Sequence, residues 1–339
     1  FVLATKGKKN DDVLKTLKKG EVVDLINCSK KVGELTVEET FPIDPNERLI
    51  NIFGTSDPYH PGVKHTRSRL GKTAVSGDYH VSYPLIQDNL KRIQSMISKT
   101  GAKRVSSMMI AANPLNRAHE RMIRQTISDN DLLIIFLRKP FTTEGLRYDI
   151  RHNALATFVE NFMPRNKVLI IPFENSYIFA GFNELVLDAL LAKNYGCHQL
   201  VIGKNHGGLG LYYDKNRLNS IFDACKNIDI EIKTIDEYVY CDVCKTLVST
   251  NTCPHGQHHH VHYHSESIMK LLQAGVIPPP ILMRKEVSAN ILTSLFPERF
   301  ENLQELYYSL MPGSGLLEQK SEEQFYQKMI ELYQTSSLT

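Results

Sequence analysis

The segment VSSMMIAANPLNRAHERMIRQT, residues 105–126, joins a short apolar run to an Asn-Pro turn and an amphipathic stretch of helical length. The apolar run predicts a buried strand, and the turn after it opens a helix. Polar groups at a turn between a strand and a helix N-terminus are a common way to bind phosphate. We therefore expect a strand, turn and helix unit with a phosphate site at the turn.

Four more short runs, rich in apolar and β-branched residues, follow this segment and are separated by stretches of helical length. They cover residues 131–137, 166–173, 197–203 and 230–235. Such alternation predicts an α/β fold with a parallel sheet and crossover helices. Because ligands bind these sheets at the carboxyl ends of the strands, the polar and glycine-rich residues there are candidate site residues.

The region before residue 100 has a different pattern. Alternating segments at 21–28, 33–41 and 49–55, separated by Gly, Pro and Asp-Pro signals, predict a mainly β region, and a helix is expected over 83–100. At the other end, residues 271–292 and 321–336 predict a small helical tail.

Composition narrows the class of protein. The chain has 339 residues, of which 42% are hydrophobic and 23% are charged, so it can bury a large core in two or three domains. A net charge of +3 with mixed acids and bases gives no indication of nucleic acid as a partner. The sequence contains neither a membrane helix nor a secretion signal, so we expect a cytoplasmic protein without a membrane partner. Because it starts at Phe1, we expect further residues upstream.

Three of the six cysteines lie in YCDVCKTLVSTNTCPHGQHHHVHYH, residues 240–264. This spacing is typical of a metal site, with thiolates from Cys241, Cys244 and Cys253 and one histidine completing a tetrahedron around zinc. A closed shell of this kind is structural, and it favours a reducing compartment. We assign His260 as the fourth ligand. The other histidines within reach, and thiols that bind no metal, remain alternatives; these histidines are His255, His258 and His259.

The segment GKNHGGLG, residues 203–210, has four glycines around His206. Glycine allows a backbone to approach a ligand closely, and the imidazole could contact a base or a phosphate. A merely tight loop is the alternative.

Taken together, these motifs resemble the ATP sulfurylase (sulfate adenylyltransferase) family in order and spacing, over about residues 20–292. The matching blocks are FGTSDPYHPGV (53–63), NPLNRAHE (113–120), FAGFNE (179–184), KNYGCHQLVIGKNHGGLGLYY (193–213), TCPHG (252–256), AGVIPPP (274–280) and RKEV (284–287). The resemblance implies three domains. They are a PUA-like β domain over 1–100, a Rossmann-like nucleotidyltransferase domain over 101–275 with a zinc insert at about 238–264, and a small C-terminal domain over 276–339.

In that family a sulfate oxygen attacks the α-phosphorus of MgATP and pyrophosphate leaves. The resemblance therefore implies ATP with Mg²⁺, an oxyanion acceptor and a homo-oligomer. It implies catalytic roles for Asn113, Arg117 and His119, and nucleotide binding by Leu115, Asn116, Gly203, Lys204, His206, Gly207 and Gly208. Each has a structural alternative, as a turn residue, helix cap, packed histidine or ion pair.

The acceptor end departs from the family pattern. Where the family has Gln-x-Arg-Asn-Pro, this chain has Ile110 and Ala112 in place of the Gln and Arg that grip sulfate. The acceptor pocket is then expected to be apolar and lined by Ile110, Ala112, Ile178 and Ala180. Neighbouring cations could compensate; they are Arg104, Lys139, Arg147, Arg151 and Lys204.

Two functions follow from this mixture of matches and departures. The first is transfer of AMP from MgATP to sulfate or a related oxyanion. The second is an impaired homologue that binds nucleotide or acts as a scaffold. RNA binding through the PUA-like domain is a third and weaker interpretation, because no basic and aromatic face stands out.

Overall fold

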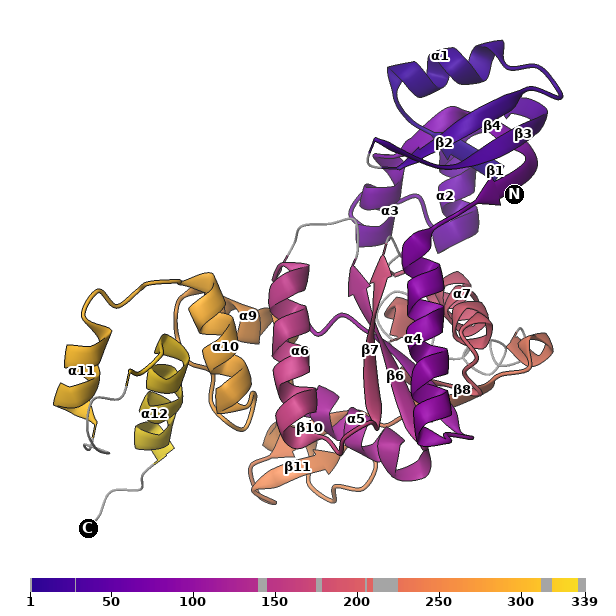
Figure 1. Ribbon diagram of the computed structural model, residues 1–339. Coiled ribbons are helices and arrows are strands. Elements are labelled where there is room, and N and C mark those ends of the chain that lie inside the picture. The colour runs from indigo at the N-terminus through magenta and orange to yellow at the C-terminus, as the bar shows by residue number, and fades with distance from the viewer. Residues whose placement is uncertain are drawn as a thin grey trace.

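The computed structural model describes residues 2–27, 29–139, 145–174, 179–204, 206–209, 225–311 and 319–334. Figure 1 shows an N-terminal unit above a central α/β unit, with a group of C-terminal helices beside helix α6. The expected order of a mainly β unit, an α/β unit with a parallel sheet and a helical C-terminus is confirmed.

The N-terminal unit is a four-stranded sheet in the order β1-β4-β3-β2, and all its strand pairs are antiparallel. A β-bulge lies between Val37 and Glu39, opposite Gly77. A Cβ atom at Gly77 would lie 1.9 Å from the carbonyl oxygen of Thr36, so only glycine fits there. The elements are β1 (Val2–Thr5), α1 (Lys8–Thr16), β2 (Val22–Asn27), β3 (Lys30–Pro42), α2 (Pro45–Phe53), α3 (Pro61–Arg67) and β4 (Leu70–Val81).

The prediction of a strand at 49–55 is wrong. Residues 49–53 form the second half of helix α2, and Gly54 is its C-cap. Asp44 caps the helix by accepting a hydrogen bond from the Asn46 amide at 2.9 Å, and Gly54 ends it with φ 72°. Leu49 and Phe53, one helical turn apart, are buried. The two caps and the four-residue spacing of the buried side chains favour a helix more strongly than the short alternating pattern favours a strand.

The central sheet is parallel and has the order β7-β6-β5-β8-β9. All five expected strands are present. The chain runs outward from β5 to β7 and then returns to β8 beside β5, so the switch point of the sheet lies between β5 and β8. The elements are α4 (Pro84–Thr100), β5 (Val105–Ile110), α5 (Arg117–Asp129), β6 (Leu132–Lys139), α6 (Tyr148–Phe162), β7 (Val168–Glu174), α7 (Gly181–Asn194), β8 (Gln199–Gly203), η1 (His206–Gly208), η3 (Lys226–Ile228) and β9 (Glu231–Ile235).

Strand β5 is buried on both faces, which is typical of a central parallel strand. Its two serines are satisfied by neighbouring strands. Ser106 donates to the Leu132 carbonyl at 3.3 Å, and Ser107 donates to the Gln199 carbonyl at 3.0 Å. Polar residues in the middle of this core therefore strengthen the sheet rather than form a site.

Two helical layers cover the sheet. Helices α5 and α6 pack on one face through residues such as Ile123 and Phe158, and α4 and α7 pack on the other through Ile93 and Leu185. Helix α4, which the sequence pattern grouped with the first hundred residues, thus contributes to the central core.

Within the described ranges, the chain after β9 forms a small sheet and then four α-helices. The small sheet, in the order β11-β10-β12, packs beside α5, where the Tyr238 hydroxyl donates to Gln125 at 2.5 Å. No helix in the described ranges is long and apolar enough to cross a membrane. The elements are β10 (Tyr238–Cys241), β11 (Thr246–Ser249), η4 (Gln257–His259), β12 (His260–Val261), α9 (Ser265–Gln273), α10 (Lys285–Leu295), α11 (Leu303–Leu310) and α12 (Glu322–Gln334).

The N-terminal unit lies against the carboxyl edge of the central sheet (Figure 1). Asn183, at the start of α7, donates to the carbonyls of Asn51 and Ile52 at 3.0 and 2.7 Å. Tyr83 donates to Glu174, the last residue of β7, at 2.9 Å. The edge at which ligands bind such sheets is therefore next to the N-terminal unit.

Replacing Ile93 by alanine should lower the free energy of unfolding by about 2–5 kcal/mol, because its side chain is fully buried between α4 and the sheet. Ile86 on the same helix is 47% exposed, and Ile86→Ala should cost less than about 1 kcal/mol. Denaturant unfolding of both variants measures the difference. Equal losses would mean that α4 is not part of the central core.

Candidate active site and metal centre

The turn after β5 is fixed by Asn113, which forms a cis peptide bond with Pro114. The Asn113 side-chain oxygen accepts a hydrogen bond from the Leu146 amide at 2.8 Å. A Cβ atom at Gly145 would lie 2.1 Å from the Asn113 amide nitrogen, and Gly145 has φ +88°. The glycine therefore makes room for the asparagine, and Asn113 joins the β5 turn to the segment that leads into α6.

Arg151 on α6 ties the same region together. Its guanidinium donates to the carbonyls of Leu146, Ala111 and Arg138 at 3.0, 2.7 and 2.8 Å. The residue is 5% exposed, and burial lowers its pKa. No carboxylate in the described part of the chain pairs with it. Its hydrogen bonds to described residues come from Nε and Nη1, and none comes from Nη2. Arg151 therefore places a positive charge at the ends of β5 and β6.

Helix α5 begins with a reciprocal cap. The Asn116 side chain accepts from the His119 amide at 3.1 Å, and His119 Nδ1 accepts from the Asn116 amide at 3.2 Å. This is a capping box with histidine in the place usually taken by Glu or Gln. Because Nδ1 is the acceptor, the proton of the neutral ring lies on Nε2. Burial lowers the pKa of His119 to about 4, so the ring is a neutral donor at neutral pH.

His206 belongs to a buried ionic network rather than standing alone in its loop. Its Nε2 lies 2.8 Å from Asp188 on α7, and Asp188 also accepts from Arg138 at 2.5 Å. Arg138, from the end of β6, pairs with Glu184 as well. The network therefore fixes the glycine-rich loop to α7 and β6. The carboxylates and His206 form a possible metal group, but the guanidinium already occupies both acids.

Two glycines of the loop around His206 pack closely against neighbouring helices. A Cβ atom at Gly207, whose φ is +59°, would lie 3.0 Å from the Gly181 carbonyl at the start of α7. Gly203 faces α5, and a Cβ atom there would lie 3.7 Å from Met122 Cε. Lys204 bonds to Asn251 at 3.3 Å. The loop after β8 is thus packed between α5 and α7; Asn205 lies outside the described residues.

Arg117 points toward the segment before α10. Its Nε donates to the Pro280 carbonyl at 2.9 Å, and its Nη1 lies 3.2 Å from Glu120. Arg284 pairs with the same Glu120 oxygen at 2.8 Å. Burial raises the pKa of Glu120, although both arginines oppose the shift. Two motifs separated by some 160 residues therefore meet here, and the guanidinium of Arg117 is held by protein groups.

The apolar residues expected to line an acceptor pocket do not form one cluster. Ile110 and Ala112 are buried in the core beneath α5 and α6, whereas Ala180 packs with Leu49 and Phe53 of the N-terminal unit. Ile178 lies outside the described residues. Their predicted role is untested and stays a prediction.

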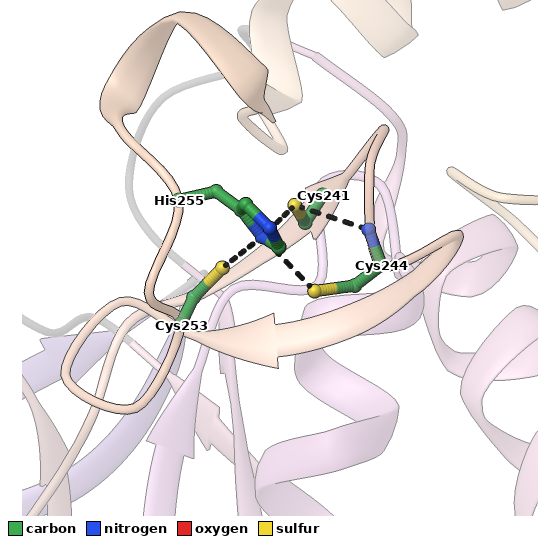
Figure 2. A group of neighbouring side chains, drawn as sticks. All are labelled: Cys241, Cys244, Cys253 and His255. Atoms are coloured by element: carbon green, nitrogen blue, oxygen red, sulfur yellow. Dashed lines mark hydrogen bonds between the residues drawn. The ribbon is translucent and has the colours of Figure 1, made fainter.

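The cysteine segment forms a compact donor group (Figure 2). His255 Nδ1 lies 3.4, 3.3 and 3.6 Å from the sulfurs of Cys241, Cys244 and Cys253. A tetrahedral zinc with ordinary Zn–S and Zn–N bonds separates its ligand atoms by about 3.6 Å. The donor set and spacing therefore fit a metal ion. The five cysteines in the described part of the chain are all free.

The assignment of His260 as the fourth ligand is wrong. The group contains His255, two residues after Cys253, whereas His260 starts β12 and pairs with Cys241 across the strands. Its Nε2 is buried without a hydrogen-bond partner among the described residues. The turn at Cys253-Pro254-His255 brings the first histidine to the sulfurs, and sequence spacing alone could not rank the histidines.

Local sequence patterns do not indicate the partners of His206. Arg138 is the penultimate residue of the largely apolar strand β6, and Glu184 and Asp188 lie four apart on a largely apolar helix. Charged residues within apolar strands and helices are rarely fully buried without a partner. Their presence there is the sequence feature that indicates a buried ionic network.

The titration of His119 predicts how stability depends on pH. Its folded pKa, about 4, lies below the ordinary value of 6.5, so the folded state resists protonation. The stabilisation is complete above pH 6.5 and is lost as pH falls toward 4, by roughly 3 kcal/mol. His119→Gln keeps a capping side chain and should flatten this part of the profile. Denaturant unfolding from pH 7.5 downward compares the two; profiles of equal slope would contradict the assignment.

Comparisons with known proteins agree with this geometry. The family model for ATP-sulfurylase matches residues 86–294, and a PUA-like domain model matches residues 8–83. The chain is 28% identical over 277 residues to a sulfate adenylyltransferase of Chloroflexus aurantiacus, covering 79% of this chain and 72% of that protein. It is 29% identical over 283 residues to one of Psychrobacter cryohalolentis, covering 80% and 68%.

A solved structure described as a hexameric APS kinase from Thiobacillus denitrificans is similar in fold, with a TM-score of 0.61 and 16% identity. The match covers 83% of this chain and 50% of that one, so this chain spans half the length of that structure. The parallel sheet, the motifs at its carboxyl edge and a family match over most of the chain lead to one conclusion. The chain belongs to the ATP sulfurylase family.

Proposed function

We propose that this protein transfers AMP from MgATP to sulfate or a related oxyanion and releases pyrophosphate. The observation that carries the proposal is the position of the β5 turn and the glycine-rich loop. They follow adjacent strands at the switch point of the parallel sheet, where such folds bind nucleotides. In the reaction an acceptor oxygen forms a bond to the α-phosphorus as the bond to the pyrophosphate oxygen breaks.

The triphosphate would lie at the N-terminus of α5. The helix dipole favours an anion there. His119 adds a neutral Nε2–H donor held in place by the Asn116 cap. Backbone groups of Gly203, Gly207 and Gly208 would approach the nucleotide from β8. Leu115 would pack against it, and Lys204 would add a positive charge.

Asn113 and Arg117 already form hydrogen bonds within the protein, and these bonds limit how each could contact a phosphate. Asn113 already accepts from the Leu146 amide, which leaves its side-chain NH₂ as the donor for a phosphate oxygen. Arg117 is bonded to Pro280 and Glu120, so contact with phosphate would require its side chain to rotate.

Arg151 is the residue we propose as a positive group for the acceptor. It lies at the ends of β5 and β6, beside the Ala111 carbonyl, where the family's own arginine is replaced by Ala112. Its Nη2 donates no hydrogen bond to a residue within the described ranges. Two donors on one nitrogen at a partly desolvated edge suit an oxyanion.

A second function is an impaired homologue that binds nucleotide without turnover. The observation that favours this function is that the polar side chains at the site already bind other groups of the protein. Arg151 serves three carbonyls, Arg117 serves Pro280 and Glu120, and Ile110 and Ala112 are apolar.

Pyrophosphate release decides between the two functions. Purified protein with ATP, Mg²⁺ and a panel of sulfate, phosphate and carboxylate acceptors should release pyrophosphate with at least one of them. Arg151→Lys should lower kcat by about 10²–10³ because one fixed donor pair is lost. Arg165→Lys, which changes an exposed arginine between α6 and β7, is the matched control. Calorimetric nucleotide binding without release would favour the impaired homologue, and neither binding nor release would contradict both.

We further propose that the Cys241, Cys244, Cys253 and His255 group holds a structural zinc. Mass spectrometry of purified protein should find about one zinc per chain. His255→Ala should lower the zinc content because it removes a ligand, whereas His260→Ala should leave it unchanged. Loss in the His260 variant alone would restore the original assignment of the fourth ligand.

A further inference from the structure

A pocket lies beside α5, and no described residue of the glycine-rich loop lines it. It has a volume of 530 Å³ and lies between α5, the small sheet that carries the metal group, and the segment before α10. Its charged lining residues are four cations and one acid: Arg117, Arg121, Arg124, Lys245 and Glu120.

The charges in this pocket are unbalanced. Glu120 is bonded to Arg117 and also to Arg284, which lies outside the lining. Arg121, Arg124 and Lys245 have no carboxylate partner in the part of the chain that the structure describes. Three positive charges thus converge on one pocket without a counter-ion from any described residue, and such an arrangement attracts anions.

Protein contacts already orient two of these cations. The Arg121 guanidinium lies over the Tyr238 ring, 5.8 Å from its centroid, and Arg124 donates to the Phe162 carbonyl at 2.9 Å. Each contact leaves other N–H donors of the guanidinium available. Side chains held in this way lose less entropy when an anion binds.

The size of the pocket selects a compact ligand. Arg117, Arg121 and Arg124 follow one face of α5 and span about 10 Å along its axis. Tyr263 closes one side, where its hydroxyl donates to the Ile281 carbonyl at 2.7 Å. The span fits two or three linked phosphate groups, whereas an extended nucleic acid would need a longer basic surface.

We propose that this pocket is a binding site for a small polyphosphate anion, of the diphosphate or triphosphate class. The site differs from the nucleotide site proposed above, because no described residue of the glycine-rich loop lines it and Arg117 is the one candidate residue of that site that it shares. It is formed only when the metal-bearing sheet packs on α5, since Lys245 comes from the turn between Cys244 and β11.

Calorimetry with inorganic tripolyphosphate tests the site on the full chain. The variant R121E/R124E should raise the Kd by about tenfold or more, because two attractive charges become repulsive. The matched control K64E/K91E makes the same change in net charge at exposed lysines on α3 and α4 and should bind as the wild type does. Circular dichroism and denaturant unfolding of both variants establish that they fold.

Four results would overturn the proposal. One is wild-type protein that binds no tripolyphosphate. Another is equal affinity in wild type and R121E/R124E, which would place the anion elsewhere. The third is an equal loss in both variants, which would indicate net charge rather than a site. Short single-stranded RNA that binds more tightly than tripolyphosphate, and loses that binding in R121E/R124E, would likewise replace the small anion with a nucleic acid.

Discussion

Three carbonyl groups at the carboxyl edge of the central sheet share one buried guanidinium, that of Arg151. A buried charge without a carboxylate is costly unless neighbouring dipoles solvate it. The ends of β5 and β6 and the start of α6 are therefore held in one arrangement, and the Asn113 turn lies within it. The position of every other candidate residue at this edge depends on that arrangement.

Around this centre the protein uses two kinds of polar contact. The Asn116 and His119 cap holds the start of α5 without the negative charge that a Glu would bring to a capping box. The His206 network instead buries two acids with Arg138, and so fixes the loop after β8. Rigid loops at the ends of adjacent strands are what a reaction governed by positioning requires.

Part of the fold and site was predictable because it depends on local patterns. The five central strands were found, since each is a short apolar run between helices. Residues 49–55 were assigned wrongly, because the cap at Asp44 and the turn at Gly54 mattered more than alternation. The prediction of His260 in place of His255 is wrong, because sequence spacing does not show which histidine a turn brings back to the sulfurs. Asp188 was missed because nothing local links it to His206.

The sequence by itself determined the family, the parallel α/β unit and the residue types at its carboxyl edge. These follow from periodicity and from motifs whose order survives divergence. Only the tertiary structure decided which groups meet: Arg151 with three carbonyls, Arg117 with Pro280, and His206 with Asp188. Such pairings join residues far apart in the chain, and they depend on how helices pack across a sheet, which no local pattern records.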